Sequence, residues 1–189
     1  GITYYIRKNT KPEQRASFYI IQNVGALMED DDQNGMAHFL EHMAFNGTKN
    51  IPGKTLIDGL EKKGVTFGKK INAYTNFNET VYNLTDIQVD DPGLLDTCLL
   101  ILHDWSNNIS LENSEIDKER GVIAEEYRTR KSGSQRVFVQ TLQFLMSGSK
   151  YAERDIIGTM DVILKGSPDR LRDIYHDWYR TDMQAIVVV

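Results

Sequence analysis

Two histidines four residues apart, His38 and His42, constrain this chain more than any other feature of its sequence. They enclose Phe39-Leu40-Glu41 in the pattern H-x-x-E-H, and the surrounding residues favour a helix. Residues four apart on a helix share a face, with Cβ atoms about 5–6 Å apart, so both imidazoles can reach one cation. A Zn²⁺ ion bound at about 2.0–2.1 Å by each ring fits this spacing. Glu41 points to the same side, where a general base is needed.

The helix expected over residues 35–45 has two unlike faces. Its apolar residues follow the i, i+3, i+4, i+7 spacing of a helix packed on a core. They are Met36, Phe39, Leu40 and Met43. At 100° per residue, the two histidines and Glu41 fall on the opposite face. The alternative is that these polar residues are merely solvent-exposed, but two of only four histidines in the chain, with a glutamate between them, favour a metal site.

A catalytic zinc takes three protein ligands and leaves one position open, so a third ligand must come from elsewhere in the chain. The residues Ser114–Asp117 resemble a capping box, which predicts a helix from there to about residue 130. This helix carries Glu115, Glu119 and Glu126 on one face. Spacing alone leaves the choice between Glu119 and Glu126 open. The alternative is a solvated acidic stripe.

Composition restricts the class of protein further. With 189 residues, 40% of them apolar and 26% charged, the chain suits one soluble globular domain. The net charge of −5 and the scattered Lys and Arg residues exclude a nucleic-acid stripe, and no apolar run approaches the roughly 20 residues that span a bilayer. A peptide or protein partner fits better. The single cysteine, Cys98, is expected to be buried, and His103 and His176 are expected to be structural.

The order of expected elements favours an α+β fold with a mainly antiparallel sheet packed against helices. Strands are expected over residues 2–7, 17–24, 67–75, 80–85 and 185–189. Helices are expected over residues 35–45, with Asn34 as N-cap, and over 55–63, 91–107, 114–130, 135–146 and 169–179. The first residues do not resemble a signal peptide. The final valine run is a strand pattern without a following turn, which suggests a fragment of a longer protein.

Three segments of the chain resemble one family, the pitrilysin, insulin-degrading enzyme and mitochondrial processing peptidase group, whose zinc motif is H-x-x-E-H. Gly35–Thr48 resembles the active-site helix of this family. Asn72–Thr75 resembles its substrate-binding edge strand, and Glu119–Glu126 resembles its distal glutamate helix. The resemblance therefore spans essentially the whole chain, in order.

The resemblance implies that residues 1–189 form the N-terminal zinc-binding domain of an endopeptidase that cleaves peptides or small unfolded proteins. It implies that His38, His42 and Glu126 bind Zn²⁺. Glu41 would be the general base, and Glu119 would be a nearby acid that supports the site without binding the metal.

The resemblance also implies how substrate and partner are arranged. A peptide would add as a strand beside Asn72, Ala73 and Tyr74. A second homologous domain, in the same chain or on a partner subunit, would complete a clamshell around it. The resemblance also suggests that the protein is located in a bacterial periplasm or cell envelope, with the cytoplasm as the alternative. Two rival interpretations are a non-catalytic subunit of the same fold and a purely structural zinc domain. The intact H-x-x-E-H pattern argues against the first. An open coordination position and Glu41, which a structural site would not need, argue against the second.

Overall fold

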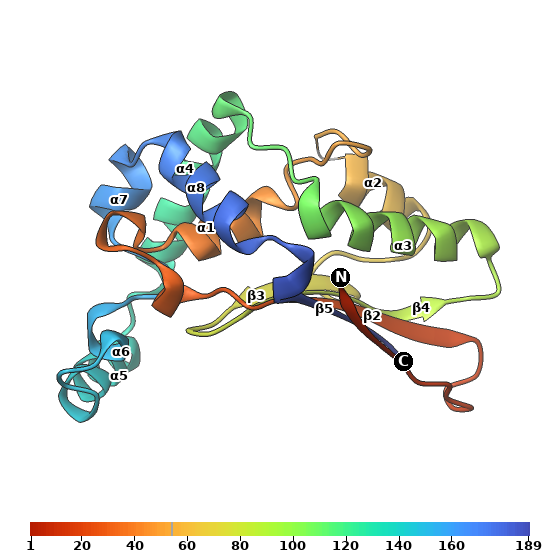
Figure 1. Cartoon of the computed structure of the whole chain (residues 1–189), viewed down its shortest axis with the longest axis horizontal. Helices are drawn as coiled ribbons and strands as arrows, with labels where there is room; N and C mark the ends of the chain where they lie inside the picture. Colours follow the sequence, from red (N-terminus) through yellow and green to blue (C-terminus); the bar gives the residue numbers. More distant parts are fainter. Residues whose placement is uncertain (54) are drawn as a thin grey trace.

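The structure, a computed structural model, describes residues 1–53 and 55–189. One layer is a five-stranded sheet in the order β1-β5-β2-β4-β3, and most helices lie on one of its faces (Figure 1). The strands are β1 (Thr3–Ile6), β2 (Arg15–Gln22), β3 (Ile71–Thr75), β4 (Thr80–Gln88) and β5 (Gln184–Val188). The β1–β5 pair is parallel and the other three pairings are antiparallel. The predicted α+β fold with a mainly antiparallel sheet is confirmed.

Eight α-helices and three short 3₁₀ helices occur in the described residues. The α-helices are α1 (Met36–Met43), α2 (Thr55–Lys62), α3 (Pro92–Asn107), α4 (Asn113–Arg130), α5 (Gly133–Leu145), α6 (Lys150–Glu153), α7 (Met160–Lys165) and α8 (Pro168–Trp178). The 3₁₀ helices are η1 (Ala26–Met28), η2 (Asp31–Gln33) and η3 (Thr181–Met183). In Figure 1, α5 and α6 form a projection at one end of the molecule, away from the helical layer over the sheet.

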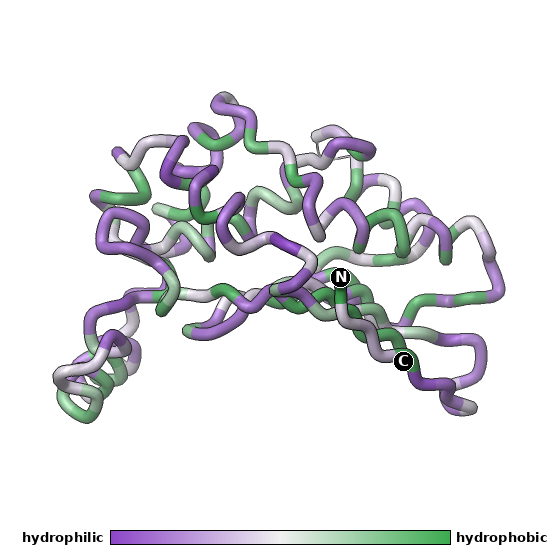
Figure 2. Tube along the Cα trace, in the orientation of Figure 1, coloured by the Kyte–Doolittle hydropathy of each residue, from purple (hydrophilic) through white to green (hydrophobic). Residues whose placement is uncertain are grey.

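The core lies between the sheet and the helices. Alternate residues of β2, Phe18 and Ile20, are buried, as the period-two direction of strand side chains requires. Apolar residues concentrate along these central strands (Figure 2). Tyr82 of β4 stacks on Trp105 of α3 with ring centroids 5.2 Å apart, which joins sheet to helix. Cys98 of α3 is fully buried, as predicted.

Several predicted strand boundaries were wrong. The strand expected over 67–75 begins only at Ile71, because Gly68 adopts a positive φ of +76° and residues 68–70 form a turn. The strand expected over 80–85 continues to Gln88. Its extension has a partner because β2 begins at Arg15, earlier than predicted, and Arg15 is in register with Gln88. A local glycine turn thus decides the start of β3, and a pairing partner distant in sequence decides the end of β4.

The predicted capping box at Ser114–Asp117 was also wrong. Helix α4 begins one residue earlier, at Asn113, and its N-cap residue Glu112 makes no side-chain capping bond. The guanidinium of Arg172, on α8, donates instead to the Asn113 side chain and to the Leu111 carbonyl at 2.7 Å. A tertiary contact thus fixes the start of α4 where a local cap was expected.

The N-terminus of α1 is held by a buried carboxylate and not by Asn34, the expected N-cap. The N-cap position is Gly35, and the side chain of Glu29 accepts hydrogen bonds from the N–H groups of Gly35 at 2.9 Å and Ala37 at 2.8 Å. Burial raises the pKa of Glu29 to about 8, although both N–H groups and Arg154 act to lower it. Arg154 also donates to the Glu29 carbonyl at 3.0 Å. This contact ties the start of α1 to the segment that follows α6.

Glycine packs on glycine at the same place. Gly35 has a φ of +99°, and a Cβ added to it would lie 2.5 Å from the Cα of Gly158. Gly158 has a φ of +85°, and its own added Cβ would lie 2.4 Å from the Asn34 carbonyl oxygen. Both backbones would have to move to admit a side chain, so this contact sets the position of α1.

Substituting Gly35→Ala is expected to loosen α1, because it adds both an unfavourable positive φ and a backbone clash. A loss of more than about 2 kcal/mol in local opening free energy, roughly a 30-fold loss of protection, should appear in amide hydrogen exchange of α1 in the complete protein. Gly121→Ala is the control. A Cβ at Gly121 in α4 meets no atom within 4 Å, and alanine there should stabilise the helix by about 0.5–1 kcal/mol. Unchanged protection of α1 in Gly35→Ala would contradict this interpretation.

Candidate metal centre

Helices α1 and α4 bring three potential metal-binding side chains together. One ligand atom each from His38, His42 and Glu126 lie within 4.8 Å of one another, and no other group of three or more such residues occurs in residues 1–53 and 55–189. The Oε2 atom of Glu126 lies 3.1 Å from His42 Nε2 and 3.6 Å from His38 Nε2. The H-x-x-E-H segment of α1 therefore meets the distal glutamate of α4 in space.

These distances fit a zinc ion. Tetrahedral bonds of about 2.0–2.1 Å place neighbouring ligand atoms about 3.3 Å apart, and the two measured separations lie on either side of this value. Two imidazole nitrogens and one carboxylate oxygen are a usual donor set for catalytic zinc and leave a fourth position open. The residues present thus fit the ion in both chemistry and spacing.

The two histidines differ in their protonation. Burial, and then the charge of His42, lower the pKa of His38 to about 4, so His38 is neutral and can offer a lone pair. Burial also acts to lower the pKa of His42, but hydrogen bonds to Glu119 and Glu126 outweigh it and raise this pKa to about 9. A proton on His42 Nε2 and a metal ion would compete for the same place, so metal binding at this site would release a proton.

Glu119 contacts His42 from the side opposite Glu126. Its Oε1 atom lies 2.7 Å from His42 Nδ1, and its Oε2 atom accepts a hydrogen bond from Asn46 at 2.6 Å. A carboxylate on the second ring nitrogen fixes the orientation of a metal-binding imidazole. The spacing of the acidic residues did not decide whether Glu119 or Glu126 is the third metal ligand. In the structure, only Glu126 lies near the Nε2 atoms of both histidines. Glu115, on the same predicted face, pairs with Lys118 at 2.6 Å instead.

Glu41 is held by the end of the edge strand. The hydroxyl of Thr75, the last residue of β3, donates to Glu41 Oε2 at 2.6 Å. Burial raises the pKa of Glu41 above its ordinary value, and the Thr75 hydrogen bond partly opposes this shift. A carboxylate with a raised pKa is a stronger base, which suits proton transfer near neutral pH. Thr75 lies in the segment that resembles the substrate-binding strand, but its contact with Glu41 was not predicted.

Arg130 is a second neighbour that sequence reasoning missed. Its guanidinium lies 2.5 Å from Glu126 Oε1, at the i, i+4 spacing that favours ion pairs on a helix. The i, i+4 spacing of Glu126 and Arg130 was the sequence signal that could have predicted this ion pair. The other two histidines are not part of the site: His103 has a side chain 65% exposed, 3.2 Å from Asp104, and His176 is exposed on α8. Both lie at the surface and not in the core.

Strand β3 presents a free edge beside this site. The N–H of Thr85 bonds to the Lys70 carbonyl and the N–H of Asn76 to the Glu79 carbonyl, so even-numbered residues between them direct their backbone toward β4. The backbone of Ala73 therefore faces the open edge. Its N–H is taken by the side-chain oxygen of its neighbour Asn72 at 2.9 Å. The side chains of Asn72 and Tyr74 are exposed.

Residues 4–159 match the family described as insulinase (peptidase family M16), and the chain belongs to this family. Among curated proteins, the probable zinc protease PqqL of Haemophilus influenzae is 41% identical over all 189 residues, and that of Escherichia coli is 35% identical. Both matches include 100% of this chain but only 20% of the length of each relative.

Solved structures agree with this assignment. The first half of the periplasmic protease PqqL from Escherichia coli matches with a TM-score of 0.95 and 35% identity, covering 100% of this chain and 40% of that one. Pitrilysin matches with a TM-score of 0.79 at 21% identity, covering 100% of this chain and 20% of that one, which shows a shared fold. Across the described residues, no helix is long and apolar enough to cross a lipid bilayer.

Proposed function

We propose that this chain is the zinc-binding domain of a metalloendopeptidase, with His38, His42 and Glu126 as the zinc ligands. The observation that carries the proposal is the convergence of these three side chains at separations of 3.1 and 3.6 Å between donor atoms. The contact of Glu119 with His42 Nδ1 and the names of the relatives as zinc proteases support it. A purely structural zinc domain would usually have four protein ligands and no need of Glu41.

Four side chains would share the work of peptide hydrolysis. A bound zinc ion supplies Lewis-acid activation of water and of the scissile carbonyl. Glu41 takes a proton from the attacking water and passes it to the leaving amine. Thr75 holds the Glu41 carboxylate in place through its hydroxyl hydrogen bond. Glu119 keeps the His42 ring oriented, and Arg130 holds the second oxygen of Glu126.

The substrate would bind as an additional strand along β3. The outward N–H of Ala73 is available for a peptide carbonyl once the Asn72 side chain swings away. Asn72 and Tyr74 would then flank the peptide through their exposed side chains. Pairing through the main chain depends little on sequence, so it favours broad substrate tolerance.

The relatives are about five times longer than this chain, so the complete protein is proposed to supply a second, homologous domain that closes over the peptide. Because one close structural match is named a periplasmic protease, we propose a periplasmic location for this protein too. The rival proposal is a non-catalytic subunit of the same fold. The convergence of His38, His42 and Glu126, together with the Thr75 hydrogen bond that holds Glu41, favours the enzyme.

A chelation experiment tests the proposal. The complete protein should cleave an internally quenched peptide, lose this activity after dialysis against a chelator, and regain it on adding about one equivalent of Zn²⁺. Magnesium at the same concentration is the control, because a site with two imidazoles selects zinc over magnesium. Full activity in the metal-free protein would exclude a zinc-dependent mechanism.

A further inference from the structure

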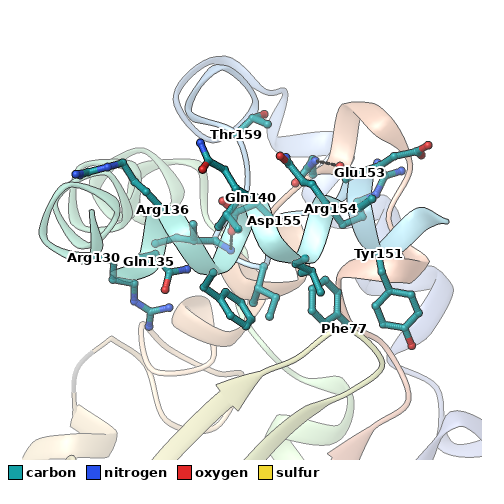
Figure 3. Close-up of a pocket in the computed structure, with 18 of the residues that line it drawn as sticks. Phe77, Arg130, Gln135, Arg136, Gln140, Tyr151, Glu153, Arg154, Asp155 and Thr159 are labelled. Carbon is teal, nitrogen blue, oxygen red and sulfur yellow. Dashed lines mark hydrogen bonds between the residues drawn. The ribbon is translucent and has the colours of Figure 1, made fainter. Parts of the chain in front are cut away.

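A cavity of about 650 Å³ (Figure 3) shares two lining residues, Thr75 and Arg130, with the surroundings of the metal centre. Residues of α5 line one side of it, and residues of the β3–β4 turn and of the segment after α6 line its other walls. Thr75, which bonds Glu41, and Arg130, which pairs with Glu126, line it as well. Since Thr75 also ends β3, a peptide paired with that strand would continue into this cavity.

Aromatic side chains form much of the cavity wall. They are Phe77, Tyr127, Phe138 and Tyr151. The rings of Phe77 and Tyr151 pack with centroids 5.1 Å apart, which fixes one end of the wall. A volume of this size lies within the range of ligand sites and exceeds that of any one side chain, so it has room for several residues of a peptide.

The charge of the cavity is opposite to that of the chain. Four cationic side chains line it against two acidic ones, whereas the whole chain carries −5. Two of the cations are already paired, Arg154 with Asp31 and Arg130 with Glu126.

The other two, Lys131 and Arg136, make no ion pair within residues 1–53 and 55–189. Lys131 lies over the ring of Tyr127, with its Nζ atom 4.3 Å from the ring centroid. In Figure 3 Arg136 and Arg130 lie toward the same end of the cavity, opposite Tyr151 and Glu153. Arg130 pairs with Glu126, so the positive end of the cavity contacts a proposed metal ligand.

We propose that this cavity makes the enzyme selective for peptides with an acidic residue near the scissile bond and apolar residues beside it along the cavity. Lys131 and Arg136 provide the selectivity by attracting the acidic residue at the positive end of the cavity. The aromatic wall binds the apolar residues. The inference rests on the proposed function, because the peptide path runs from the metal centre along β3. If the peptide runs antiparallel to β3, the residues that reach the cavity precede those paired with the strand.

Peptide binding to the complete, zinc-loaded Glu41→Gln protein tests this inference without requiring turnover. The probe is a fluorescent apolar decapeptide in which a single Glu, or its neutral isostere Gln, occupies each position in turn. At low ionic strength, the Glu peptide should bind about threefold to tenfold more tightly than the Gln peptide when the substituted position lies on one side of the segment paired with β3. This ratio is the size expected for one or two partly exposed charge pairs. Added salt should reduce the difference.

The double variant Lys131→Gln/Arg136→Gln should remove the preference and leave affinity for the Gln peptide unchanged. Lys62→Gln is the matched control, because Lys62 is an exposed cation on α2 and does not line the cavity. Equal affinities for the Glu and Gln peptides, or a preference that survives the double variant, would overturn the inference. Failure of the wild-type protein to cleave either peptide would instead count against the proposed function, and the binding comparison would stand.

Discussion

Replacing Glu41 with Gln in the complete protein is expected to lower kcat for peptide hydrolysis by about 10²–10⁴-fold, the usual contribution of a positioned general base. The amide keeps the size of the carboxylate and can still accept the Thr75 hydrogen bond, but it cannot take a proton from water. Because Glu41 is not among the three converging ligand atoms, zinc should stay bound. Quenched-peptide kinetics and elemental analysis of the same preparation measure both effects.

Glu125→Gln is the matched control for this experiment. Glu125 lies on α4 and pairs with Arg128 at the surface, so the same chemical change there should leave kcat unaffected. Turnover by Glu41→Gln at the wild-type rate would remove Glu41 from the role of base. Loss of zinc together with activity would show that Glu41 acts on metal binding.

Replacing Glu126 with Gln is expected to weaken zinc affinity by more than about 100-fold, because it removes a charged ligand from a site with three. Glu119→Gln should have a smaller effect, about 10–100-fold, as is usual for a group that orients a metal-binding imidazole. Competition with a fluorescent zinc chelator, at fixed pH because metal binding releases a proton, measures both affinities.

The order of the two effects is the decisive result. One carboxylate oxygen of Glu126 lies within 3.6 Å of both Nε2 atoms, whereas the carboxylate of Glu119 contacts Nδ1 of His42. A larger loss in Glu119→Gln than in Glu126→Gln would mean that these two glutamates have the opposite roles.

Local sequence patterns predicted the elements whose stability is mostly local. The apolar stripe of α1 lies in the core as expected. The helix predicted over residues 169–179 is α8, where Ser167 accepts a hydrogen bond from the N–H of Asp169 at 3.2 Å. Patterns failed where a partner outside the helix decides the outcome. Glu29 reaches the start of α1 in place of Asn34 only because the chain folds back on itself, a contact that no helix periodicity encodes.

The site was predictable to a similar extent. Two imidazoles and a glutamate on one helix face follow from the spacing of His38, Glu41 and His42. The partner glutamate could not be chosen from spacing, because Glu119 and Glu126 share a face of α4 and differ only in which histidine nitrogen they reach. The Thr75–Glu41 contact and the cationic cavity need the sheet, α4 and α5 to be assembled, so the sequence did not predict them.

The central claim is that one zinc ion is held by side chains from α1 and α4. A crystal structure of the zinc-loaded complete protein, with diffraction data collected on both sides of the zinc absorption edge, tests it most directly. The expected result is one anomalous peak about 2.0–2.2 Å from His38 Nε2, His42 Nε2 and a Glu126 oxygen. A peak bound by other residues, or a fully occupied peak that lacks any of these three ligands, would contradict the account.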